Sequence, residues 1–202
     1  KKLDTKTTFC LCHIGSRKVS SRWGAVAFPS AWKPRTWSTD QPGWRRKRRA
    51  RRRRTMPKTI LVVYHTMSGN TAAAAAAVAE GIRSVPGVEA VVKLAADADE
   101  NDLLACDAVC LGTPDYHNYM AGMLKDFLDR TYYPTEGKVT GKPYGAFVTH
   151  GGDGHAVESV ETVCGYFKLR RVAPTASVFG RPDASAEREL RHLGETLAKA
   201  VA

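Results

Sequence analysis

The chain has 202 residues, 43% of them hydrophobic, which allows one ordinary domain with extra segments or two small domains and supplies a real apolar core. Its net charge of +11 suggests a nucleic-acid partner, but residues 1–55 carry 17 Lys or Arg against two acids, whereas the remainder carries 14 against 18. The basicity therefore belongs to the N-terminal segment, and we expect no specific nucleic-acid partner for the rest.

The five cysteines form no tight framework, and an odd count of this kind is typical of a reduced, cytoplasmic protein. Cys10, Cys12 and His13 could form half of a metal site, but no second pair completes it, so we expect no metal. Cys106 and Cys110 lie around one predicted strand, an arrangement that does not favour a redox pair. No apolar run approaches the ~20 residues that a membrane span needs, so we expect no membrane partner.

Residues 1–55 show neither helix nor strand periodicity, and nine of the ten positions at 45–54 are cationic. Such a run repels itself, so we expect a disordered basic segment. Met56 resembles a natural start and a buried-strand pattern follows it, so we interpret residues 1–55 as translated upstream sequence or a non-native tail. The alternative is a basic arm that binds nucleic acid or other anionic surfaces non-specifically.

From Ile60 onward, apolar runs alternate with amphipathic stretches. Ile60–Tyr64 is a continuous run of the kind that forms a strand covered on both faces. The acidic stretch 97–104 is expected to be a loop with room for a short helical turn. The expected strands span 60–64, 88–94, 107–112, 144–149 and 172–179, and the expected helices span 70–84, 121–131, 156–167 and 184–200.

This order is βα repeated five times with short connections. It predicts an α/β fold: a doubly wound, five-stranded parallel sheet with helices on both faces and right-handed crossovers. Ligands of such sheets bind beyond the carboxyl ends of the strands. The loops that leave the strand ends are therefore the candidate site.

The first candidate loop leaves a strand and opens a helix. It contains His65, Thr66, Met67, Ser68, Gly69, Asn70 and Thr71. Its three hydroxyls can donate to phosphate oxygens, its glycine lets the backbone approach, and the free N–H groups of a helix start favour an anion. The loop has no Lys or Arg and matches neither GxxxxGK[ST] nor GxGxxG. The simpler interpretation is a Ser/Thr-rich helix cap, although one cap needs only one such residue.

The second candidate loop spans 112–122 and offers flat aromatic faces. Tyr116 and Tyr119 could stack on a planar ligand, and backbone groups around Asn118 could meet its polar edge. The alternative is that either tyrosine is a half-buried loop aromatic. The expected ligand contacts of this loop are Pro114, Asp115, Tyr116, His117, Asn118 and Tyr119.

The third candidate loop is rich in glycine, with three within 151–154, so its backbone can come close to a planar ligand. His150 could donate to a bound ligand, or it could be a surface histidine. Unpaired carboxylates at Asp115 and Asp153 would oppose an anionic ligand, whereas backbone N–H groups would stabilise it. The expected contacts of this loop are Thr149, His150, Gly151, Gly152 and Asp153.

These loops resemble those of flavodoxin-like proteins over nearly all of residues 58–202. The segment 66–71 resembles the phosphate loop T/S-x-S/T-G-N-T of flavodoxins, which binds the FMN phosphate. The second loop resembles that of the tryptophan-repressor-binding-protein family of NAD(P)H:quinone oxidoreductases, where it contacts the isoalloxazine ring. The third loop matches in glycine content and place more than in exact residues. The resemblance implies strand order 2-1-3-4-5, FMN as cofactor, and a flavodoxin-like FMN-binding domain at 56–202.

The chain lies between two groups of that family. It lacks the insertions with which the quinone reductases build a tetramer, yet it is less acidic than electron-transfer flavodoxins and has Tyr116 where they usually carry Trp. The resemblance implies NAD(P)H-dependent reduction of a quinone or similar small acceptor. The alternative is a non-enzymatic electron carrier with a redox protein partner. A flavin carries its own chemistry, so we nominate no catalytic residue, and a homodimer is left open.

Overall fold

The computed structural model describes residues 56–202, and the predictions for residues 1–55 lie outside them. The strands are β1 (Lys58–Tyr64), β2 (Val88–Leu94), β3 (Ala108–Tyr116), β4 (Tyr119–Met120), β5 (Pro143–His150), β6 (Arg170–Arg171) and β7 (Ala176–Phe179). The helices are α1 (Asn70–Arg83), α2 (Glu100–Ala105), α3 (Gly122–Thr135), α4 (Ala156–Tyr166) and α5 (Ala184–Lys199).

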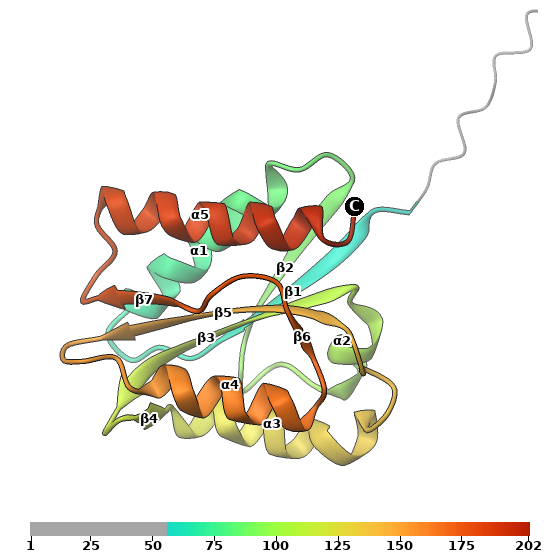
Figure 1. The fold of residues 1–202 in the computed structure, drawn as a ribbon, viewed down its shortest axis with the longest axis horizontal. Helices are drawn as coiled ribbons and strands as arrows, with labels where there is room; N and C mark the ends of the chain where they lie inside the picture. The colour runs from blue at the N-terminus through green and yellow to red at the C-terminus, as the bar shows by residue number, and fades with distance from the viewer. Residues whose placement is uncertain (1–55) are drawn as a thin grey trace, which may run out of the picture. The chain divides into compact units, whose positions relative to one another are not determined.

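The sheet has the predicted parallel topology. Its strands follow the order β2-β1-β3-β5, and β6 and β7 both pair with β5, so the order 2-1-3-4-5 is confirmed with a divided last strand. The two-residue strand β4 pairs antiparallel with the end of β3. Helices α1 and α5 cover one face of the sheet and α2, α3 and α4 cover the other (Figure 1).

Small residues explain how closely α1 and α5 approach each other. Four alanines of α1 are buried, namely Ala74, Ala75, Ala77 and Ala79. A methyl group on Gly81 would overlap the backbone of Arg191, and one on Gly194 would overlap the backbone of Val78. The alanine-rich stretch is therefore a helix selected both by propensity and by close packing.

The structure corrects three predicted boundaries. Strand β3 continues to Tyr116, because Pro114 lies where β1 has already ended and its missing N–H costs no bond in the ladder. The expected strand 172–179 is divided into β6 and β7, with Pro174 in the gap. The short helical turn expected in the acidic stretch 97–104 is the six-residue helix α2, which begins at Glu100 and continues to Ala105.

Candidate functional site

The N-terminus of α1 is open to an anion. Its N-cap, Gly69, adopts a left-handed conformation (φ 85°), no side chain caps the first turn, and that turn holds no acid. The first helical bond runs from Ala73 N–H to Gly69 C=O at 3.0 Å, so the N–H groups of residues 70–72 have no partner within the helix. The interpretation of this loop as a simple side-chain cap is therefore wrong.

The Thr66 and Ser68 hydroxyls of the same loop are both able to donate to a ligand. Thr66 Oγ1 accepts the Gly69 N–H at 3.0 Å, which closes the loop and leaves the Thr66 O–H free to donate. Ser68 is exposed, and within residues 56–202 its hydroxyl has no hydrogen-bond partner. Met67 is also exposed. Both hydroxyls can therefore donate to a ligand above the helix.

Thr71 lies at the inner end of the loop and is buried. Its hydroxyl is 2.7 Å from the Thr149 hydroxyl, and either can be the donor. This contact joins the first and third candidate loops inside the protein. The observed partner of the Thr71 side chain is thus another side chain, and its predicted bond to phosphate stays a prediction.

The second candidate loop is a tight β-hairpin and not an open loop. Pro114, Asp115 and Tyr116 belong to β3, and Tyr116 pairs with Tyr119 of β4. The two residues between them, His117 (φ 56°) and Asn118 (φ 64°), are both left-handed, as a type I′ turn requires. The tyrosines at its base are 37% and 46% exposed, so each ring is partly open to a ligand.

Buried hydroxyls hold this hairpin in place, and the sequence reasoning missed them. Thr113 accepts the Ala121 N–H at 2.8 Å and donates to Pro114 C=O at 2.8 Å. Ser159 of α4 accepts the Met120 N–H at 3.0 Å. The only sequence signal was a threonine directly before a proline at a strand end.

Asp115 fastens the hairpin to α4. Its carboxylate accepts the N–H of Ala156, the first residue of α4, at 3.0 Å. The carboxylate is therefore paired and caps a helix start, where negative charge is favourable. Asp153, in contrast, is exposed, and its carboxylate lies 3.7 Å from the His155 ring.

The third candidate loop begins inside β5, which ends at His150. The His150 ring is edge-on to Phe179 and its Nδ1 lies 2.6 Å from Gly152 C=O, so the side chain organises its own loop. Gly151 and Gly152 are exposed with open space around them, as a close backbone approach requires.

The three segments meet at one edge of the sheet. The His65 ring lies edge-on to the Tyr116 ring with centroids 6.3 Å apart, and Pro114 is in register with Thr149. Beside the hairpin is a hollow of about 530 Å³. It is lined by Asn118, Tyr119, His155, Glu158, Ser159 and Thr162.

Comparison with known proteins agrees with this geometry. Residues 88–181 match the family described as NADPH-dependent FMN reductase. A flavodoxin from Aquifex aeolicus (strain VF5) is 32% identical over 142 residues, which cover 62% of this chain and 77% of the relative.

The chain belongs to the flavodoxin-like family.

Two further proteins are similar to this flavodoxin-like chain. The structure of a flavodoxin from the domain Archaea is 26% identical with a TM-score of 0.66, covering 71% of this chain and 98% of that one. An NAD(P)H dehydrogenase (quinone) from Geobacter sulfurreducens (strain ATCC 51573 / DSM 12127 / PCA) is 32% identical over 115 residues, or 43% of this chain. The match spans only 57% of that relative's length.

FMN is the cofactor of this family, and the flavodoxin-like chain has donors that fit it. The open start of α1, with its hydroxyls and without a cation, suits a phosphate held by hydrogen bonds. The exposed tyrosines suit a flat ring system. The cofactor predicted from the sequence is confirmed for the family, whereas the individual contact residues stay predictions.

The cysteines of the described part take no part in this site. Cys106, Cys110 and Cys164 are buried free thiols, and burial raises the pKa of all three, that of Cys164 to about 12. They therefore stay protonated and unreactive at neutral pH. Residues 56–202 contain no cluster of His, Cys, Asp and Glu that could hold a metal, and no helix among them is both long and apolar enough to cross a membrane.

Proposed function

We propose that this flavodoxin-like protein is an FMN-dependent oxidoreductase that uses NAD(P)H to reduce quinones or similar small acceptors. The observation that carries the proposal is the meeting of an uncapped helix start and a tyrosine hairpin at one sheet edge. The name of the Geobacter relative, NAD(P)H dehydrogenase (quinone), supports the choice of substrates.

In this proposal the protein binds and orients while the cofactor reacts. The N–H groups at the start of α1, with the Thr66 and Ser68 hydroxyls, bind the phosphate. Tyr116 and Tyr119 contact the flavin ring, and the open backbone at Gly151 and Gly152 supplies N–H donors to its polar edge. FMN, when bound, supplies hydride acceptance and transfer.

The two carboxylates beside the site oppose an electron-rich ring only weakly. Asp115 is satisfied by the start of α4, so its carboxylate is less repulsive than an unpaired one. Asp153 is exposed to solvent, which screens it. The hollow beside the hairpin has the size of a small-molecule pocket and is the proposed place for the acceptor.

Steady-state kinetics of the FMN-loaded protein test this function. We expect NADH or NADPH oxidation that depends on an added quinone, and Tyr119→Ala should lower kcat/KM for the quinone at least about tenfold, as loss of one stacked ring allows. Tyr133 is an exposed tyrosine on α3, so Tyr133→Ala is the matched control and should leave kcat/KM unchanged. FMN-loaded protein that oxidises neither nucleotide with a quinone contradicts the proposal.

The second candidate function is a flavodoxin-type carrier that passes single electrons to a redox protein. It is favoured by the match to the archaeal flavodoxin, of which this chain covers 98%. A reductive titration followed by absorbance separates the two functions. Two resolved one-electron steps support the carrier, and a single two-electron step supports the enzyme.

A further inference from the structure

The outer strand of the sheet, β2, has an open edge. Within residues 56–202, β2 pairs with β1 on one side and with no strand on the other. It is seven residues long and contains no proline, and Val91, Val92 and Leu94 are 37%, 37% and 41% exposed. Soluble proteins usually shorten, charge or cover such an edge, because it is a template for another strand.

The direction of the free peptide groups follows from the ends of the β1–β2 ladder. Lys58 N–H donates to Gly87 C=O and Ala95 N–H donates to Tyr64 C=O, both at 2.8 Å. In a parallel ladder, residues of one strand alternate between its two neighbours. Odd-numbered residues of β2 therefore face β1, and even-numbered residues turn their N–H and C=O groups to the open edge.

Some of these outward groups already have partners. Val88 N–H donates to Val85 C=O at 3.3 Å, and Leu94 C=O accepts the N–H groups of Asp97 and Ala98 at 3.0 and 3.1 Å. Within residues 56–202, the edge groups without a hydrogen-bond partner are the Ala90, Val92 and Leu94 N–H groups and the Val88 and Val92 C=O groups. Ala90 C=O accepts one exposed 3.3 Å bond from the Arg83 guanidinium, which leaves its second lone pair for another donor.

The sequence of β2 is complementary to itself when reversed about Val91. An antiparallel copy in this register places Glu89 opposite the partner's Lys93, and Val91 opposite the partner's Val91. On the other face it places Val88 opposite the partner's Leu94 and Ala90 opposite the partner's Val92. Oppositely charged and apolar cross-strand pairs both stabilise a sheet.

The hydrogen bonds select the same register. In this register Val88 lies opposite the partner's Leu94. The Val88 N–H and the Leu94 C=O would otherwise bond to each other, and both already have partners within their own chains. The free Leu94 N–H then meets the partner's Val88 C=O, and Ala90 and Val92 exchange bonds with their counterparts. Sliding either copy by two residues removes the Glu89–Lys93 pairing and this match.

We propose that β2 is a dimerisation edge through which two copies of this chain join antiparallel about Val91 into one continuous sheet. A closed twofold contact of this kind uses the same strand on both copies. Lys93 already holds Asp102 at 2.7 Å, and its side chain is 35% exposed, so Glu89 of the second copy extends an existing ion pair. The proposal is independent of the reaction that the flavin site performs.

Charge reversal with the full-length, FMN-loaded protein tests the register. We expect a dimer by analytical ultracentrifugation, and Glu89→Lys and Lys93→Glu should each raise the dimer Kd at least about tenfold, because each sets like charges opposite one another. An equimolar mixture of the two variants should form dimers again, since both cross-strand pairs are then complementary.

Two further variants keep the test clear of folding effects. Val91→Lys places two ammonium groups at the twofold axis without touching the Lys93–Asp102 pair, and it should also give monomers. Glu136→Lys reverses an exposed charge in the turn after α3 and should leave the dimer intact. A wild-type monomer overturns the proposal, and so does a dimer that survives Glu89→Lys and Val91→Lys with an unchanged melting curve.

Discussion

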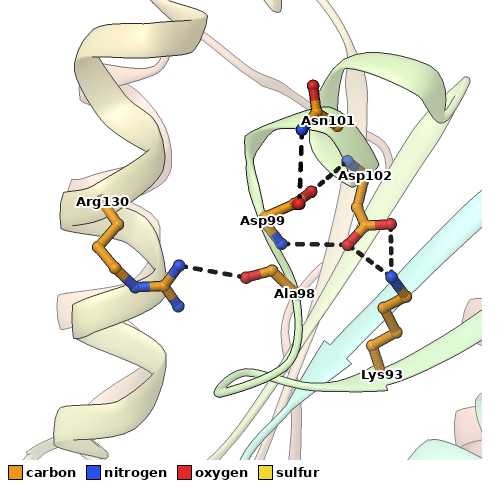
Figure 2. A network of polar contacts seen from close by, with 6 residues as sticks. All are labelled: Lys93, Ala98, Asp99, Asn101, Asp102 and Arg130. Atoms are coloured by element: carbon orange, nitrogen blue, oxygen red, sulfur yellow. Dashed lines mark hydrogen bonds and ion pairs between the residues drawn. The ribbon is translucent and has the colours of Figure 1, made fainter.

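The starts of α1 and α2 lie at the carboxyl ends of neighbouring strands, yet side chains cap only the start of α2. At α2, Asp99 accepts the Asp102 N–H at 3.0 Å and Asp102 accepts the Asp99 N–H at 3.1 Å, which is a complete capping box. Lys93 adds two bonds to Asp102 (Figure 2). At α1 no side chain takes that role. The contrast supports the proposal that the open start of α1 binds a ligand.

The segment that leads into α2 is also held by hydrogen bonds. Arg130 of α3 donates to Ala95 C=O at 3.1 Å and to Ala98 C=O at 3.3 Å, and Figure 2 shows the second of these contacts. Helix α2 has only six residues and needs this support. The 14-residue α1 packs along α5 and β2 and does not depend on a cap. It can therefore leave its N–H groups to a cofactor at little cost to the fold.

The largest expected effect comes from giving α1 the acid that it lacks. Ser68→Asp places a carboxylate where the phosphate is proposed to bind, so we expect the Kd for FMN to rise at least about 100-fold. The same carboxylate should not lower the Tm of the FMN-free protein, because an acid at a helix start is favourable. Fluorescence titration and a thermal melt measure the two effects.

Asn101→Asp is the matched control for this change, since it adds the same charge to the exposed first turn of α2. Its FMN affinity should equal that of the wild type. An equal loss of affinity in both variants would show that net charge, and not the start of α1, governs binding.

The sequence predicted the elements of the site better than their connections. The hydroxyl-rich loop was visible because Thr66, Ser68 and Gly69 are adjacent in the chain and follow a β-branched run. The Thr71–Thr149 contact was not visible, because it joins residues 78 positions apart and depends on strand register. The tight hairpin was hidden for a related reason, since His117 and Asn118 replace the Asn-Gly pair that usually marks a type I′ turn.

Two substitutions in the α1 loop should separate ligand binding from stability. Ser68→Ala removes an exposed hydroxyl, so we expect FMN binding to weaken by ~1–3 kcal/mol with an unchanged Tm in the FMN-free protein. Thr71→Val leaves the Thr149 hydroxyl unpaired in the interior and should lower the free energy of unfolding by ~1–3 kcal/mol.

Thr149→Val is the control for the second substitution, because it breaks the same contact from the other side. Chemical denaturation of the FMN-free variants should give similar losses for both. A stable Thr71→Val variant with normal FMN affinity would remove Thr71 from both roles.

At α2 the expected result is the reverse of that at α1. Asp99→Ala removes the cap, so we expect the Tm to fall by about 2–4 °C while the Kd for FMN is unchanged. Asp97→Ala changes an exposed acid just before the cap and is the control, with no expected loss. A thermal melt and an FMN titration of both variants measure this, and weaker FMN binding by Asp99→Ala would mean that the two helix starts are coupled.

The smallest effect is a difference in how the two helix starts respond to acid. The Asp102 backbone N–H, which donates to the Asp99 carboxylate, lowers the pKa of Asp99. A carboxyl whose pKa is lower in the folded state stabilises the protein above its unfolded pKa of about 4, and the gain is lost as the pH falls through the folded pKa. The Tm difference between wild type and Asp99→Ala should therefore persist at pH 5 and shrink only below about pH 4.

A phosphate monoester gains a proton at about pH 6, so FMN affinity at α1 should already fall a few-fold between pH 7 and pH 5. If affinity instead stays constant to pH 5 and falls together with the Asp99 contribution, the phosphate does not depend on the open start of α1.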